Sequence, residues 1–284
     1  MSDTAPTTAP AAPAPARTPR DWTAIRTIMR KDITAVRRSK SITIPMILVP
    51  IVLLVVLPVV LGNIARSVDP GAALSSPIVK NLLGAISDLP PREQPPVLVL
   101  QLLLSPLLLV IPLMVSAVLA ADAFAGEKER RTLESLLHLP ITDRDLFLAK
   151  LLGAFVPALV ITWAGTVLYA VVANVVAWPV TERLIIPFSQ WSLMMAWVAP
   201  AVALLAIGLL VLVSSRARTT QEANQLGGAV ILPLILLAAG QAAGFLLTPL
   251  PVVFGFGLLV WIVALGIVMW GSRRFTRDRL ATAA

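Results

Sequence analysis

The sequence predicts an all-α integral membrane protein with six transmembrane helices. Of its 284 residues, 57% are hydrophobic and only 13% are charged, and its mean hydropathy is +0.87. An ordinary soluble domain has roughly 25% charged residues. The chain also contains several uncharged stretches that exceed the ~20 residues a helix needs to cross the hydrocarbon core of a bilayer. The composition therefore excludes a water-soluble globular protein.

The uncharged stretches set the positions of the predicted helices within a transmembrane domain at 41–272. The longest stretch, 223–272, contains the sequence TPLP at 248–251, and two prolines so close together do not continue a helix. We therefore expect two spans there, with a tight turn between them. The six predicted spans are about 42–61, 96–121, 150–177, 193–213, 226–247 and 252–271.

Basic residues are distributed unevenly between the two sides of this arrangement. Both termini share one side, and the segments on that side hold 19 of the 23 Lys and Arg residues. The other side holds Arg66, Lys80, Arg92 and Arg183. Because cytoplasmic loops carry the excess of Lys and Arg, we expect a multi-pass protein of the cell membrane with both termini in the cytoplasm. The net charge of +8 then reflects topology, and no nucleic-acid partner is expected.

Segments of different composition flank the predicted transmembrane domain. Residues 1–20 are rich in Ala and Pro and are predicted to be disordered, and 273–284 form a basic cytoplasmic tail. Over 21–40, apolar residues recur at helical spacing among Arg and Lys, which predicts an amphipathic helix on the cytoplasmic leaflet. An ordinary solvated helix is the alternative. On the outer side, we expect a short amphipathic helix over 76–89.

The chain lacks the residues that most catalytic sites need. It has no Cys and one His, and it contains no G-x-x-x-x-G-K-[ST] loop to hold ATP phosphates. No predicted span has an ionisable residue at its centre, where proton and ion relays usually place one. Polar residues in the spans, such as Gln101 and Asn174, are expected to form interhelical hydrogen bonds, with substrate contact as the alternative. We therefore expect no enzyme activity, no catalytic residue and no metal or cofactor site in this chain.

The segment 122–149, between the second and third predicted spans, combines both signs of charge with an ordered apolar pattern. Leu133, Leu136 and Leu137 fall on one face of a short helix that Pro140 ends. An apolar ridge ringed by charges is a suitable docking surface for a protein, and a charged connection without a partner is the alternative. The expected exposed rim consists of Glu127, Lys128, Glu129, Arg131 and Glu134.

The same segment carries a helix start signal. Thr142 and Asp145 have the spacing of a capping box, in which each side chain bonds to the backbone of the other residue. We expect this pair to open the helix that becomes the third span.

Two runs in this segment carry a family resemblance. GEKERRTLESLL at 126–137, together with LPIT at 139–142 and an acidic residue before LAK at 148–150, resembles the signature of ABC-2 type transporter permeases. The closest pattern, E-K-E-R-G-T-L-E-x-L-L, is that of the sodium-export-permease-like branch, and Arg131 stands where it usually has glycine. A second loop, SRARTTQEAN at 215–224, resembles the family's [ST]-x-x-E-A element. The resemblance covers most of 21–275.

The resemblance implies an ABC-2 permease-like membrane subunit that moves substrate using ATP hydrolysed elsewhere. Residues 127–139 would be a coupling helix in a cleft of an ABC ATP-binding subunit that binds ATP and Mg, and 21–40 would be an elbow helix. The permease would work as a dimer with a second permease chain, either a homodimer or a heterodimer. The implied coupling residues are Glu127, Lys128, Glu129, Arg131, Thr132, Leu133, Glu134, Leu136, Leu137 and Pro140, with a secondary cytoplasmic contact at Arg216, Arg218 and Glu222.

Two functions remain open for this sequence. The leading hypothesis is the permease subunit of an ABC exporter, and the alternative is a membrane scaffold or assembly factor that recruits a soluble partner through 122–149. The cargo is also open, because spans without central charges favour a lipid-like or drug-like compound, whereas the branch resemblance implies sodium.

Overall fold

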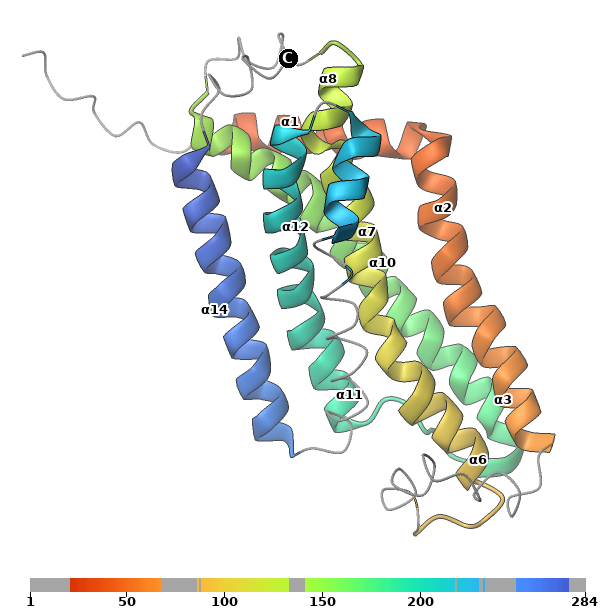
Figure 1. Cartoon of the computed structure of the whole chain (residues 1–284). Helices are drawn as coiled ribbons and strands as arrows, with labels where there is room; N and C mark the ends of the chain where they lie inside the picture. Colours follow the sequence, from red (N-terminus) through yellow and green to blue (C-terminus); the bar gives the residue numbers. More distant parts are fainter. Residues whose placement is uncertain are drawn as a thin grey trace, which may run out of the picture.

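The computed structural model describes residues 21–67, 86, 88–132, 141–217, 219–229, 232 and 249–275. In this part of the chain the regular structure is helical, without a β-strand, and long helices run side by side (Figure 1). Five of them are long and apolar enough to cross a membrane, which indicates an all-α, multi-pass membrane protein. The five candidate spans are Met46–Ser67, Gln94–Glu129, Asp143–Thr181, Ser189–Arg216 and Leu250–Arg274.

Several spans join α-helical elements through π-helical or 3-10 turns. The first contains the second half of α2 (Lys40–Ile51), a π-helical turn (Val52–Val56) and α3 (Leu57–Ser67). The second contains α6 (Gln94–Val97), a π-helical stretch (Leu98–Leu104), a 3-10 stretch (Ser105–Leu109), α7 (Val110–Ala121), a π-helical turn (Asp122–Gly126) and α8 (Glu127–Glu129). The others are α10 (Asp143–Thr181), then α11 (Ser189–Leu193), a π-helical turn (Met194–Val198) and α12 (Ala199–Arg216), and finally α14 (Leu250–Arg274).

These helices extend beyond the predicted spans. The helix predicted over 96–121 continues beyond its predicted end, to Glu129. The third span begins at Asp143, where Thr142 accepts a hydrogen bond from the backbone N–H of Asp145 at 3.1 Å, as the capping box predicts. Uncharged stretches mark only the part of a helix that lies in hydrocarbon, whereas the helix itself continues wherever its charges find partners.

Some predictions fall outside the described residues. The fifth predicted span, 226–247, lies almost wholly there, as do the expected outer helix over 76–89 and the tail 1–20. The prediction of six spans therefore stays a prediction at 226–247, while the other five predicted spans correspond to the candidate spans.

Helix α1 (Trp22–Arg38) lies across the end of the bundle, roughly perpendicular to the spans (Figure 1). The carboxylate of Asp21 caps it by accepting from two backbone N–H groups in the first turn, at 3.0 and 3.1 Å. Its apolar face packs on α10 and buries Ile25, Ile28 and Val36. Protein therefore covers these three side chains. A bilayer contact of the rest of α1 stays a prediction.

Helix α10 and the span Gln94–Glu129 pack together along the bundle. Near the end opposite α1, the buried hydroxyl of Tyr169 donates to the carbonyl of Leu100 at 2.5 Å, and the hydroxyl of Ser105 donates to the same carbonyl at 3.0 Å. The π-helical stretch leaves this carbonyl available, and an apolar environment requires it to be paired. Side chains from two helices thus stabilise a distorted part of the span.

Close packing of α14 depends on Gly257. A methyl group there would lie 2.4 Å from Cδ1 of Trp197, whose indole stacks on Phe254 with ring centroids 5.2 Å apart. We expect Gly257→Ala to destabilise the protein by about 1–3 kcal/mol, because the indole must leave a packed position. Thermal unfolding of the purified chain in detergent measures this effect.

Gly255 provides the matched control, because a methyl group there meets nothing within 4 Å among the described residues. Gly255→Ala should unfold at the same temperature as the parent or higher. Equal losses for both variants would contradict the packing role of Gly257.

Candidate coupling site

The span Gln94–Glu129 ends in a π-helical turn that α12 holds in place. In the turn Asp122–Gly126, the backbone N–H groups of Phe124 and Ala125 both donate to the buried hydroxyl of Ser214, each at 3.1 Å. The same hydroxyl donates to the carbonyl of Ala121 at 2.8 Å. A wide turn frees backbone groups from the helical ladder, and Ser214 pairs three of them. The end of the second span therefore has a fixed position on α12.

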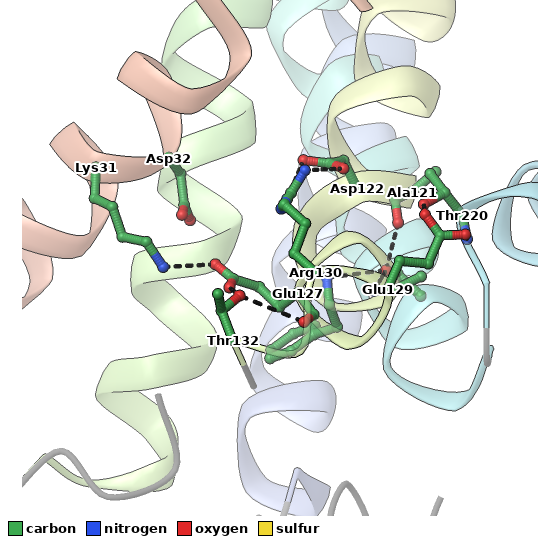
Figure 2. Close-up of polar contacts among 12 residues, drawn as sticks. Lys31, Asp32, Ala121, Asp122, Glu127, Glu129, Arg130, Thr132 and Thr220 are labelled. Atoms are coloured by element: carbon green, nitrogen blue, oxygen red, sulfur yellow. Dashed lines mark hydrogen bonds and ion pairs between the residues drawn. The ribbon is translucent and has the colours of Figure 1, made fainter. Parts of the chain in front are cut away.

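Glu127 follows this turn and points into the protein (Figure 2). Its residue is only 3% exposed, and its Oε1 accepts from the ammonium groups of Lys31 at 2.7 Å and Lys150 at 3.0 Å. The hydroxyl of Thr132 donates to the other carboxylate oxygen. Glu127 was expected on an exposed rim, and this is wrong because two cations from α1 and α10 surround it. One carboxylate thus joins the second span to α1 and α10.

Lys150 completes a four-residue ion cluster, defined as Lys31, Asp32, Glu127 and Lys150. Its ammonium lies 3.1 Å from a carboxylate oxygen of Asp32, and its side chain is 1% exposed. Burial raises the pKa of Asp32 above its ordinary value, since the attraction of Lys150 offsets only part of the cost of desolvation. A cavity of about 20 Å³ beside Asp32 and Lys150 has room for one water molecule.

The next two residues point the other way, toward α12 and the helical residues 220–229. Lys128 donates from Nζ to the carbonyls of Ser215 at 3.1 Å and Ala217 at 2.9 Å, where the C-terminal end of α12 favours a cation. Glu129 accepts from the backbone N–H of Thr220 at 2.8 Å, where the start of a helix favours an anion. Three consecutive residues therefore connect α1 and α10 to α12 and 220–229.

The chain reverses at Arg131, which has a left-handed backbone with φ of 56°. Its N–H bonds to the carbonyl of Lys128, and the N–H of Thr132 bonds to the carbonyl of Glu127, both at 3.0 Å. These two bonds and the left-handed residue make a Schellman C-cap, whose left-handed position favours glycine. The permease signature that 126–137 resembles usually has glycine at this position, and the left-handed backbone gives the physical reason.

The structure brings together only part of the predicted site. Thr132 contacts Glu127, Arg216 is exposed at the end of α12, and the backbone N–H of Glu222 donates to the hydroxyl of Thr219 at 3.0 Å. No group of His, Asp and Glu in the described ranges is arranged to hold a metal ion. The predicted residues outside the described part of the chain are Leu133, Glu134, Leu136, Leu137, Pro140 and Arg218, so the apolar docking ridge stays a prediction.

Sequence reasoning missed four residues of this site, namely Lys31, Asp32, Lys150 and Ser214. For two of them, the sequence contains a feature that indicates a buried partner. Asp32 is the only acidic residue between Trp22 and Lys40, and Lys150 lies at the start of an uncharged span. A lone charge of either kind in such a position needs a partner of opposite charge, which only the fold identifies.

The buried ammonium of Lys150 should be essential for stability. We expect Lys150→Met to lower the free energy of unfolding by about 3–5 kcal/mol, because two largely buried carboxylates lose the cation between them. Thermal unfolding of the detergent-solubilised chain gives the comparison.

The ion pair between Arg183 and Glu93 at the opposite end of the bundle is the control. Its atoms lie 3.0 Å apart, but the side chain of Arg183 is 53% exposed. Arg183→Gln should therefore change stability by only about 0–1 kcal/mol. A Lys150→Met variant as stable as Arg183→Gln would refute the ion cluster as a structural centre.

Comparison with known proteins assigns the chain to a family. No curated protein sequence matches the chain. The family model described as ABC-2 family transporter protein matches residues 26–253, which include most of α1, the ion cluster and the turn at Arg131. The match covers well over half of the chain, so the protein belongs to the ABC-2 transporter family and is a membrane permease component of an ABC transporter.

Proposed function

We propose that the chain is the permease subunit of an exporter whose ATP is hydrolysed by a separate ATP-binding subunit. The α1 end of the bundle faces the cytoplasm of the cell, and the segment 122–149 is the coupling element on which that subunit docks. The observation that carries this proposal is the connection of Glu127, Lys128 and Glu129 to four helical elements at once.

These connections suit the transmission of a displacement. A partner that pushes on 133–140 acts on a backbone that continues directly into Glu127–Glu129. Removing one partner of a buried ion pair costs about 3–5 kcal/mol, so the ion cluster favours movement as a unit over separation. The displacement therefore reaches α1 and α10 through Glu127, and α12 through Lys128.

A second permease chain is part of the proposal. Among the five candidate spans of the described residues, Met46–Ser67 and Leu250–Arg274 are the least enclosed, with 22% and 28% of their most apolar stretches buried, against 67% for Ser189–Arg216. Their outer faces expose large apolar side chains, including Ile44 and Leu48 on α2 and Leu259 and Ile262 on α14. Lipid and a second permease chain together account for this apolar surface. Sodium, a lipid-like compound and a drug-like compound remain the candidate cargoes.

Docking is tested by co-expressing this chain with a P-loop ATP-binding subunit from the same organism. We expect the two proteins to co-purify, and we expect the permease alone to release phosphate only at background rate because it has no phosphate-binding loop. Leu133→Ala with Leu136→Ala should abolish co-purification, because truncation in the centre of a contact costs about 2 kcal/mol or more per residue. The measurement is the amount of ATPase per permease.

Leu103→Ala with Leu168→Ala makes the same chemical change at two exposed positions of the second and third spans and should leave co-purification intact. Glu127→Gln should retain the ATPase but lower transport per ATP, since it acts on transmission and not on docking. If the Leu133 and Leu136 variant stays monodisperse and binds the ATPase like the parent, docking on this segment is wrong.

Topology is tested with single cysteines in this cysteine-free chain. Ser67, at the end of α3, and Thr27, on α1, are both exposed and lie at opposite ends of the bundle. We expect an impermeant thiol reagent to label Ser67→Cys in intact cells and to label Thr27→Cys only after the cells are opened. The reverse pattern would mean that the protein is inverted in the membrane.

A further inference from the structure

The connection between α10 and α11, residues 182–188, folds back into the bundle at the end opposite α1. It begins at Glu182, whose left-handed backbone ends α10. Ile185 and Ile186 are only 5% and 0% exposed and belong to the same hydrophobic core as the spans. We call residues 182–188 the outer strap. It is therefore part of the packed interior, although it has no helical structure.

Two amide side chains pair the backbone of the strap. The Oδ1 atom of Asn174 accepts from the N–H groups of Ile185 at 2.8 Å and Ile186 at 3.2 Å, and its Nδ2 donates to the carbonyl of Ile186 at 2.5 Å. The amide of Gln101 donates to the carbonyl of Ile185. All four backbone polar groups of Ile185 and Ile186 are thus paired by side chains of α10 and the span Gln94–Glu129.

The strap is bonded to both helices about two turns inside their ends. Asn174 lies seven residues before the end of α10, and Gln101 lies seven residues after the start of its span, so each is about 10 Å inside the helix end. Asn174 is also one turn deeper than Trp178, an exposed indole of the kind that marks the membrane interface. Non-helical backbone at such a depth is tolerated only where protein or a water-filled cavity surrounds it.

We propose that the outer strap is a gate that closes the outer end of the bundle and is released when α10 separates from the span Gln94–Glu129. The proposal rests on the transport function proposed above. Ile185 is bonded at once to Asn174 of one helix and Gln101 of the other, so separation of the helices breaks the attachment on at least one side. Water then replaces the lost amide bonds, and the two isoleucines leave the path between the helices.

The opening of the gate is measured by how fast a thiol reagent reaches residue 186. In the cysteine-free chain, Ile186→Cys puts a small apolar thiol at a buried position of the strap. The full-length protein in lipid nanodiscs exposes both faces to a charged thiol reagent, so the assay does not depend on topology. We expect Asn174→Ala to accelerate labelling of this cysteine about tenfold or more, because four backbone hydrogen bonds are reduced to one and the strap opens more often.

Asn224→Ala is the matched control, because Asn224 is an exposed asparagine in the helical residues 220–229, at the α1 end of the bundle and away from the strap. It should leave the labelling rate unchanged. If Asn174→Ala does not fold, Gln101→Met removes only the bond to Ile185 and should accelerate labelling severalfold. Unchanged labelling in a monodisperse Asn174→Ala or Gln101→Met variant would contradict the proposal that these amide side chains hold the strap closed.

A second experiment compares labelling of the same cysteine with and without nucleotide bound to the ATP-binding subunit. With the ATP-binding subunit bound and trapped with Mg-ATP and vanadate, Ile186→Cys should be labelled about tenfold faster or more than without nucleotide. Unchanged labelling, when ATP hydrolysis depends on the permease, would overturn the gate and leave the proposed function intact. If no ATP-binding subunit associates, the proposed function fails, and the Asn174 comparison still decides whether side chains hold the strap.

Discussion

The rest of the structure depends on the buried ion pair between Lys150 and Glu127, which lie 3.0 Å apart with side chains 1% and 4% exposed. Neither charge could stay in an apolar interior alone, so each fixes the position of the helix that carries it. Lys150 also holds Asp32 of α1, and Glu127 also holds Lys31. Helix α1, the end of the second span and the start of the third therefore have fixed positions relative to one another, and the turn at Arg131 follows directly from them.

The same two helices are also joined at their other ends. Near α1 the contact is between charges, whereas at the outer end Asn174 and Gln101 hold the strap through neutral amides. A transporter that opens alternately to its two sides needs contacts at both ends that do not all break together. In the proposed cycle, the ion cluster keeps the cytoplasmic ends of the helices together while the outer ends separate. The helix pair then pivots about Lys150 and Glu127.

The sequence alone predicted five of the helices seen here, because uncharged stretches record which residues can lie in hydrocarbon. It also predicted the helix cap by Thr142, a local pattern, whereas Gln101 and Asn174, expected to form interhelical hydrogen bonds, instead bond to the non-helical strap. The helix end at Glu129 and the burial of Glu127 were missed for a physical reason. They depend on Lys31, 96 residues away, and no local pattern encodes such a contact. Charged residues between two spans are ordinarily solvated, and this rule led to the prediction of an exposed rim. The structure buries Glu127 instead.

The different chemistry of the two ends determines where energy has to enter. Neutral amides that hold a backbone lose little when water replaces the protein partner, so the strap can follow a movement that starts elsewhere. The ion cluster does not exchange partners so easily, because a buried charge without its counterion is costly. Force applied to 133–140 therefore reaches the helices through Glu127 without being lost in a local rearrangement. The stiff contact belongs where ATP hydrolysis is proposed to act, and the exchangeable contact belongs where the cargo is proposed to leave.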